Sequence, residues 1–312
     1  MSSGNAKVVV TGGAGFIGSH LCALLAREHE VHVIDNLRSG NRANLIGIPH
    51  VLHEGTIGDR ALLTDVMHGA RYVFHLAAMV SVPESMEQPV ECVRTNTIGT
   101  LDVLEAAANA GVEKLVLSST AAIYGDDPTL PKRETMAPCP KSPYAVTKLD
   151  GEYYCRMFSD TGRLATACLR YFNVFGSRQN PRSAYAAAVP KFLHKALAGE
   201  PIVIHGDGGQ TRDFVHVSDV ARANLHVART AAATGVYNVA NGGSLSILDL
   251  ARRIVAITGS RSEIVHGPER PGDIRHSTAD PSALASVGFR CDGDFDRLLA
   301  ETVDAMTAPN AA

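Results

Sequence analysis

Short runs of β-branched and apolar residues alternate with longer amphipathic stretches through the first half of the chain. Apolar runs of about four to eight residues are typical of buried strands, and apolar positions three and four apart are typical of helices. We therefore expect strands at 7–11, 30–34, 72–76, 114–118 and 165–170. We expect helices at 15–27, 60–67, 89–109 and 143–159.

This alternation predicts βαβ units, and with them an α/β fold built on a Rossmann-type doubly wound parallel sheet. After residue 171 the chain becomes more polar and is interrupted by Gly and Pro, with helices expected at 189–198 and 249–258 and a strand at 201–205. We expect a first domain over 1–171, to which part of 214–240 returns. A smaller, interleaved C-terminal substrate lobe is expected over 172–312.

Composition narrows the classes of protein that remain. The 312 residues are 45% hydrophobic with a formal net charge of −3, so neither nucleic acid nor an anionic membrane is indicated as a partner. The sequence shows neither a long apolar span nor a signal peptide. The six Cys are scattered without a C-x-x-C pair, which predicts no metal site and no disulfide framework, and fits a reducing cytoplasm.

A glycine-rich loop follows the first expected strand. Gly12, Gly15 and Gly18 form G-x-x-G-x-x-G between an apolar run and a helical stretch. Glycines allow the turn and let a pyrophosphate approach backbone N–H groups at the helix N-terminus. The next strand ends in Asp35, where an acid can hold a ribose 2′-hydroxyl and repel a 2′-phosphate. This arrangement favours NAD over NADP, although Arg38 lies close by and would act in the opposite direction.

Tyr144 and Lys148 form Tyr-x-x-x-Lys and share one face of the helix expected at 143–159. A cationic Lys beside a Tyr favours the phenolate, so we expect Lys148 to lower the pKa of the Tyr144 phenol. Such a phenol can take the proton of a sugar or alcohol hydroxyl while hydride leaves the carbon.

The ordered motifs resemble the extended short-chain dehydrogenase/reductase family and, within it, the UDP-hexose 4-epimerases. The resemblance runs nearly end to end and is carried by TGGAGFIGSH (11–20), IDN (34–36), HLAA (75–78), SVPES (81–85), NTIGT (96–100), SSTAAIYG (118–125), SPYAVTK (142–148), LRYFNVFG (169–176), GDGGQTRDFVHVSD (206–219) and RPGD (270–273). SVPES and the segment YFNVFGSRQNP look most like the epimerases that act on UDP-N-acetylhexosamines.

The resemblance implies roles residue by residue. Catalytic roles fall to Thr120, Tyr144 and Lys148. Contacts with NAD are implied for Gly12, Gly15, Phe16, Ile17, Gly18, Asp35, Asn36, Thr56, Ile57, Leu76, Ala77, Ala78, Asn96, Lys148 and Tyr171. Contacts with a UDP-sugar are implied for Ser81, Val82, Thr120, Tyr144, Asn173, Val189, Arg212, Arg270, Asp273 and Ser277. Thr56 departs from the family, which usually has an acid at that position.

We therefore expect an NAD-dependent UDP-sugar 4-epimerase that inverts C4 through a 4-keto intermediate. Its expected substrates are UDP-GlcNAc/UDP-GalNAc and UDP-Glc/UDP-Gal, because Ser277 leaves room beside the sugar C2 group. One alternative is an NDP-sugar 4,6-dehydratase, whose relatives carry an Asp-Glu pair where this chain has Ala121 and Ala122. The other is a non-catalytic NAD-binding regulatory protein. The resemblance also implies a homodimer formed through the helices at 89–109 and 143–159.

Overall fold

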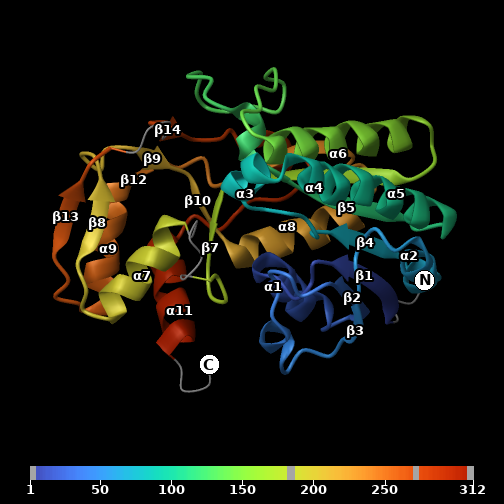
Figure 1. Ribbon diagram of the computed structural model, residues 1–312, viewed down its shortest axis with the longest axis horizontal. Helices are drawn as coiled ribbons and strands as arrows, with labels where there is room; N and C mark the ends of the chain where they lie inside the picture. The colour runs from blue at the N-terminus through green and yellow to red at the C-terminus, as the bar shows by residue number, and fades with distance from the viewer. Residues whose placement is uncertain (1–4, 181–186, 270–273, 308–312) are drawn as a thin grey trace.

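A computed structural model describes residues 5–180, 187–269 and 274–307 (Figure 1). Its main element is a seven-stranded sheet in which every neighbouring pair of strands is parallel. In spatial order the strands are β11 (Gly235–Val239), β6 (Ala165–Tyr171), β5 (Lys114–Thr120), β4 (Tyr72–His75), β1 (Ala6–Thr11), β2 (His29–Asp35) and β3 (Val51–Glu54). The order reverses at β1, and the expected Rossmann-type doubly wound sheet is confirmed.

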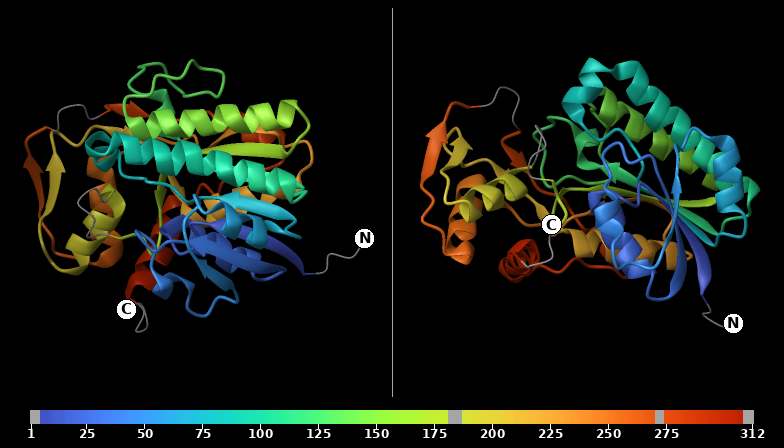
Figure 2. Two further views of the ribbon diagram at one scale, coloured as in Figure 1. Left: turned by 45° about the vertical axis from the view of Figure 1, so that its right-hand side comes forward. Right: turned by 60° about the horizontal axis from the view of Figure 1, so that its bottom comes forward.

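Two helical layers cover the sheet (Figures 1 and 2). One contains α1 (Phe16–Leu25), α8 (Val217–Arg229) and α10 (Ser282–Ser286), and the other α2 (Arg60–Met67), α5 (Gly99–Asn109) and α6 (Pro143–Asp160). Successive side chains of a strand point to opposite faces, so Val8 and Val10 pack into the first layer and Val9 into the second. All three are fully buried, which explains why strand β1 is continuously apolar.

The expected helix at 89–109 is interrupted. It consists of α4 (Pro89–Cys92), a π-helical turn η2 (Val93–Ile98) and then α5. Strands β3 and β11 and helix α8 were not predicted as elements, nor was α3 (Val82–Glu87). A 3₁₀ turn η1 (Arg42–Leu45) follows β2, and η3 (Ala121–Tyr124) follows β5.

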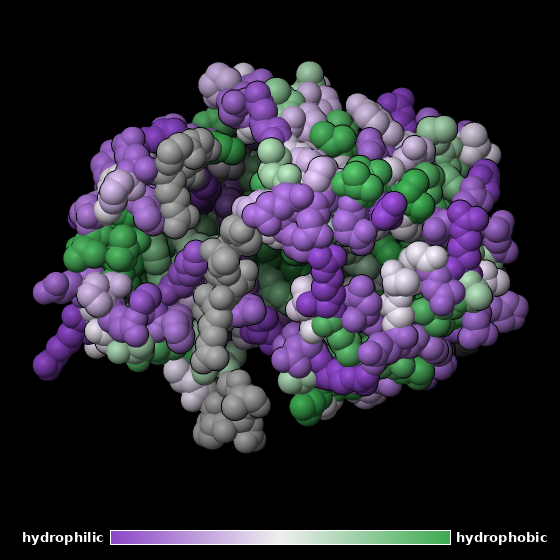
Figure 3. Space-filling model, in the orientation of Figure 1, coloured by the Kyte–Doolittle hydropathy of each residue, from purple (hydrophilic) through white to green (hydrophobic). Residues whose placement is uncertain are grey.

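The rest of the chain forms a smaller lobe beside the sheet (Figures 1 and 2). Its elements are α7 (Ala188–Leu197), β8 (Ile202–His205), β9 (Thr211–Arg212), β12 (Leu245–Ser246), α9 (Ile247–Thr258), β13 (Ile264–Gly267), β14 (His276–Ser277) and α11 (Phe295–Thr307). Strands β8 and β13 pair in parallel, and β9 lies between β12 and β14. The face shown in Figure 3 is hollowed between this lobe and the Rossmann part.

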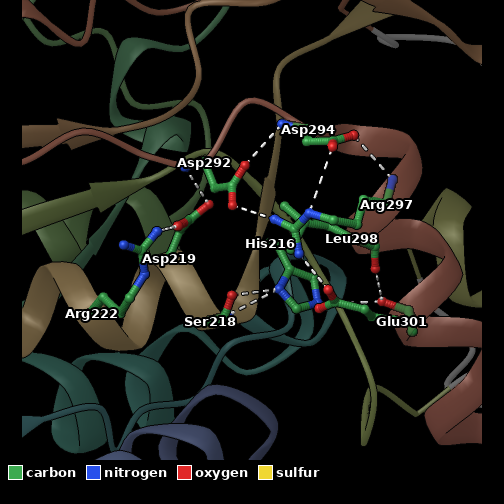
Figure 4. Close-up of polar contacts among 10 residues, drawn as sticks. His216, Ser218, Asp219, Arg222, Asp292, Asp294, Arg297, Leu298 and Glu301 are labelled. Carbon is green, nitrogen blue, oxygen red and sulfur yellow. Dashed lines mark hydrogen bonds and ion pairs between the residues drawn. The ribbon is translucent and has the colours of Figure 1, made fainter.

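The chain crosses between the two parts through β7 (Asn173–Phe175) and β10 (Phe214–His216), which pair in parallel. His216 caps α8 by accepting a hydrogen bond from the backbone N–H of Ser218, and its other ring nitrogen lies 3.3 Å from Thr302 Oγ1 on α11 (Figure 4). Strand β11 then adds the outer strand beside β6. Segment 214–240 therefore contributes both α8 and β11 to the Rossmann part, whereas the expected division at residue 171 stays a prediction.

Candidate active site

A cavity of about 810 Å³ lies at the carboxyl ends of β1, β2, β4 and β5. Ligands of doubly wound sheets bind at this edge. The residues with predicted roles that line it are Gly12, Gly15, Phe16, Ile17, Gly18, Asp35, Asn36, Thr56, Ile57, Leu76, Ala77, Ala78, Thr120, Tyr144, Lys148 and Tyr171. The fold therefore brings together residues from seven separate segments of the sequence.

The glycine loop is as tight as its sequence suggests. Gly12 has φ +73°, and a Cβ added at Gly18 would lie 2.2 Å from the Gly12 carbonyl oxygen. Helix α1 begins directly after Gly15, which forms its N-cap without a side-chain hydrogen bond. Backbone N–H groups at the start of α1 therefore face the cavity edge without a capping side chain, as an anion site requires. This geometry fits the pyrophosphate of a dinucleotide.

Asp35 ends strand β2 and lines the same cavity. Its carboxylate accepts hydrogen bonds from the backbone N–H of Ala14, at 2.9 Å, and of Leu37, at 2.8 Å. The side chain is thus fixed between the glycine loop and the loop after β2, and only 7% of the residue is exposed. A carboxylate held in this position has acceptor capacity left for a ribose hydroxyl.

The Tyr-x-x-x-Lys pair lies on the opposite wall, at the start of α6. Ser142 caps this helix by accepting from the backbone N–H of Ala145, so Tyr144 lies in its first turn. One turn later, Lys148 Nζ donates to the carbonyl oxygen of Ser118 on β5, at 2.9 Å. Thr120 ends the same strand and lines the same cavity.

Burial controls the protonation of this pair. It raises the pKa of the Tyr144 phenol to about 12, with the Thr120 side chain acting in the opposite direction, and lowers the pKa of Lys148 to about 8. The pKa of the Tyr144 phenol was expected to lie below its usual value. In the protein without bound cofactor or substrate it lies above that value, so the expectation is wrong. Loss of hydration disfavours the charged form of each group and is the largest cause of both pKa shifts.

We call the part of the cavity wall formed by Thr120, Tyr144 and Lys148 the catalytic wall. A buried ion pair supports this wall, and the sequence analysis did not predict it. Glu152 and Arg170 are 3% and 4% exposed at their side chains, and two hydrogen bonds of 2.9 and 2.7 Å join them. Ser119 Oγ also donates to Glu152, at 2.5 Å. Because Ser119 precedes Thr120 and Glu152 lies one turn after Lys148, the pair holds α6 against β5 and β6. Its signal in the sequence was a charged residue inside the apolar run of β6.

Two further predicted NAD residues have well-defined surroundings. The Tyr171 hydroxyl lies 3.0 Å from Ser118 Oγ and accepts from Asn224 Nδ2, and burial raises its pKa to about 12. Asn96 is not among the residues that line the cavity. Its side-chain amide binds the backbone N–H and carbonyl of Met79, at 2.7 and 3.0 Å, so it can act on a cofactor only through the loop after β4.

A second cavity, of about 600 Å³, lies in the smaller lobe. It is lined by the predicted residues Asn173, Val189 and Arg212, together with Lys191 and Lys195. These cationic side chains suit the phosphates of a nucleotide diphosphate. Asp213, the neighbour that could have paired with Arg212, is fully buried and accepts from three backbone N–H groups.

The remaining predicted substrate residues are more dispersed. Ser277 on β14 pairs in register with Arg212 on β9, so it lies beside the second cavity without lining it. Ser81 caps α3 and Val82 is 40% exposed, and neither residue lines either of these two cavities. Their neighbour Val80 does line the first. Arg270 and Asp273 lie outside the described residues.

Within 5–180, 187–269 and 274–307, no group of three or more His, Cys, Asp or Glu side chains is placed to hold a metal ion. Across the same ranges, the helices are too short or too polar for any of them to span a membrane.

The parallel sheet, the glycine loop at α1 and the Tyr–Lys pair define a dinucleotide-dependent oxidoreductase fold of the extended short-chain type. Residues 8–240 match the family described as "NAD dependent epimerase/dehydratase family", and the chain belongs to that family. NAD is the cofactor of this family, and the cavity described above has the groups to hold it.

Similar proteins span the whole chain. A putative UDP-glucose 4-epimerase of Methanocaldococcus jannaschii is 33% identical over 97% of this chain and 99% of its own length. The structure of a UDP-N-acetylglucosamine 4-epimerase from Methanobrevibacter ruminantium, in complex with UDP-N-acetylmuramic acid, superposes with a TM-score of 0.93 at 41% identity, covering 96% of this chain and 98% of that one. A Thermus thermophilus UDP-glucose 4-epimerase in complex with NAD gives 0.87 at 36% identity, with 97% and 99% covered.

Proposed function

We propose that this chain is an NAD-dependent UDP-sugar 4-epimerase that inverts C4 of the hexose through a 4-keto intermediate. The observation that carries the proposal is the convergence of Tyr144, Lys148 and Thr120 on the wall of the cavity that the glycine loop also lines. When bound, NAD supplies a reversible acceptor for the hydride of C4. The protein's part is to hold the sugar and to move the proton of the 4-hydroxyl.

Tyr144 is the group that takes this proton, and its phenolate has to be stabilised first. The Lys148 ammonium, fixed by the Ser118 carbonyl, is the nearest built-in cation for that purpose. Thr120 would orient the sugar hydroxyl, since its Oγ1 already accepts from the backbone N–H of Ala122, at 3.1 Å, and keeps its own O–H to donate. Thr120 therefore has a fixed position, and its side chain is hydrogen-bonded to the Tyr144 phenol, where a sugar hydroxyl could take its place.

Inversion requires that the hexose can turn while the UDP stays bound. The second cavity, lined by Arg212 and two lysines, would hold the UDP. The sugar would lie towards Val80, an apolar side chain that offers it no hydrogen bond. Few hydrogen bonds would then hold the hexose, whereas cationic side chains would hold the UDP, as inversion requires.

The substrate group we propose is UDP-GlcNAc/UDP-GalNAc together with UDP-Glc/UDP-Gal. Ser277 is small and half-buried, and its strand pairs with the strand of Arg212. A small residue there would leave space for an N-acetyl group at C2, and its hydroxyl could bond the acetamide. The reaction would belong to nucleotide-sugar and galactose metabolism. All six cysteines are free, which agrees with the reducing cytoplasm that we expect for this enzyme.

A 4,6-dehydratase is the second function that the family includes. It needs an added acid and base to eliminate water, and the residues after Thr120 offer none, because Ala121 and Ala122 begin the turn η3. Incubating the purified protein with a panel of UDP-sugars and analysing the products separates the alternatives. C4 epimers without steady production of reduced nicotinamide would support the proposal. A 4-keto-6-deoxy product would support the dehydratase, and no turnover of any sugar would support a regulatory protein.

We also propose a homodimer that uses α6 and the α4–α5 segment. Of the apolar residues that suggested this interface, Val103 and Leu104 are fully buried in the protein's own core, so they cannot take part. Tyr153 and Met157 on α6 are 53% and 59% exposed, and Val90 on α4 is 63% exposed. Light scattering at micromolar concentration should give the mass of a dimer, and Met157→Glu should shift it towards the monomer. A wild-type monomer would contradict this proposal.

A further inference from the structure

An ion pair joins two elements at the adenosine side of the first cavity. Arg38 follows β2 and lines the cavity together with Asp35. Glu84 belongs to α3, the helix that follows β4. Arg38 Nη2 and Glu84 Oε1 are 2.5 Å apart, although the residues are 46 positions apart in the chain.

We propose that Glu84 sets the preference for NAD over NADP by keeping the Arg38 guanidinium away from the ribose 2′ position. An arginine near the end of β2 is the kind of group that accommodates a 2′-phosphate, and guanidinium pairs readily with phosphate. Asp35 repels a 2′-phosphate at this position, but a free Arg38 would offset part of that repulsion. By pairing with the Arg38 guanidinium, Glu84 prevents this cation from attracting the 2′-phosphate.

The backbone around both residues is fixed, so only the Arg38 side chain needs to reorient. The Arg38 N–H donates to Asn36 Oδ1 at 3.1 Å, and the loop is tied to Asp35 through the Leu37 N–H. On the other side, the Glu84 N–H donates to Ser81 Oγ at 3.2 Å, which anchors the first turn of α3. The Glu84 carboxylate extends from this anchored turn to Arg38.

The exposure of the pair makes it a suitable specificity switch. The Arg38 and Glu84 side chains are 47% and 32% exposed. Ion pairs as exposed as this contribute little to stability, so removing one carboxylate should leave the fold intact. Asp35 does not allow an equally clean test, because its carboxylate also anchors the Ala14 and Leu37 backbone.

The experiment compares binding of 2′,5′-ADP and 5′-AMP, which differ only in the 2′-phosphate, by calorimetry on the full chain freed of nucleotide. Glu84→Gln should tighten 2′,5′-ADP about three- to fivefold relative to 5′-AMP, the range set by the small strength of an exposed pair. Arg38→Ala/Glu84→Gln should return the ratio of the two dissociation constants to the wild-type value. Glu87→Gln removes an exposed carboxylate from the same helix and is the matched control.

An unchanged ratio in Glu84→Gln would overturn the proposal. A gain in relative affinity for 2′,5′-ADP that persists without Arg38, or an equal gain in Glu87→Gln, would also overturn it. Either result would mean that the loss of any negative charge nearby strengthens the binding of the 2′-phosphate. Glu84→Asp, which shortens the carboxylate, should shift the ratio in the same direction by less. The proposal rests on the proposed function only through the NAD site, and because no sugar is present, its failure is distinct from a failure of the epimerase assignment.

Discussion

Charged groups are organised in opposite ways in the two parts of the molecule. In the catalytic wall, Arg170 and Glu152 are almost fully buried and Lys148 is 6% exposed. In the smaller lobe, Arg275 and Asp207 pair across two loops with 52% and 62% of their side chains exposed. Buried charges need their partners, whereas exposed charges can exchange theirs for water.

The contrast matches what each part is proposed to do. Proton transfer at C4 needs Tyr144 and Lys148 in one geometry, and a buried ion pair behind them enforces it. Around α11, by comparison, Arg297 pairs with Asp292, Asp294 and Glu301 on the surface (Figure 4). Such exposed pairs can be broken and formed again at little energetic cost.

The largest effect is expected at the catalytic phenol. Tyr144→Phe removes the proposed proton acceptor and should lower turnover by about 10²–10⁴, while UDP binding, which we propose for the other lobe, should stay near the wild-type value. Tyr153→Phe, an exposed residue of the same helix, is the control and should keep full turnover. Steady-state kinetics and UDP calorimetry measure both quantities. Wild-type turnover in Tyr144→Phe would remove this residue from the mechanism.

The two ion pairs give the next effect, on stability. Arg170→Met leaves Glu152 buried without its partner and should lower the free energy of unfolding by about 3–5 kcal/mol. Arg275→Met breaks the exposed pair with Asp207 and should cost about 1 kcal/mol or less. Urea denaturation of the two variants compares them directly. Equal losses would show that burial does not separate the two regions.

Ser277→Tyr tests whether the smaller lobe leaves space for different sugars. A phenol beside the sugar C2 group should fill the space for the N-acetyl group and lower kcat/KM for UDP-GlcNAc by about 10- to 200-fold, while UDP-glucose is spared. Ser277→Ala keeps the space and should retain both activities. Equal loss of both activities in Ser277→Tyr, or no activity of the wild type on N-acetyl sugars, would overturn the proposed breadth.

The smallest effect concerns pH. Lys148 has a pKa lowered to about 8 by burial, so it is an ammonium below that pH and a neutral amine above it. The reaction needs the Tyr144 phenolate, whose pKa burial raises to about 12, together with the Lys148 ammonium. Below about pH 8 the ammonium is retained while the phenolate fraction grows with pH, so kcat/KM should rise. Above that pH the loss of the ammonium offsets the growth of the phenolate fraction, so kcat/KM should level off. Lys148→Met should have a lower rate throughout and lack the break near pH 8. A wild-type profile without this break would contradict the proposed role of the cation.

Elements with a strong local signal were predictable from the sequence. Helix α2 was predicted with its observed bounds, and Asp59 caps it by accepting from the Leu62 N–H at 3.0 Å. Strand β1 and the glycine loop were predictable because an apolar run and three glycines leave few other conformations. Most of the residues predicted to contact NAD line one cavity, because they follow strands whose carboxyl ends meet at the same edge of the sheet.

What could not be predicted depends on contacts between distant segments. Strand β3 is short, partly polar and at the edge of the sheet, so its pattern is weak. The π-helical turn is a local change to i→i+5 hydrogen bonds inside a helical stretch, which residue propensities do not indicate. Glu152 and Arg170 each look like a solvated charge until the fold buries them together. The raised pKa of Tyr144 likewise follows from burial that the Tyr-x-x-x-Lys spacing does not reveal.

The central claim is that hydride leaves C4 of the UDP-sugar and returns to the same carbon. Incubating the purified protein with UDP-GlcNAc carrying deuterium at C4, in ordinary water and without added NAD, tests it most directly by mass spectrometry and NMR of the products. We predict a mixture of UDP-GlcNAc and UDP-GalNAc in which the deuterium stays at C4 of both. Replacement of the label by solvent hydrogen during inversion, or a product that has lost water, would contradict the account.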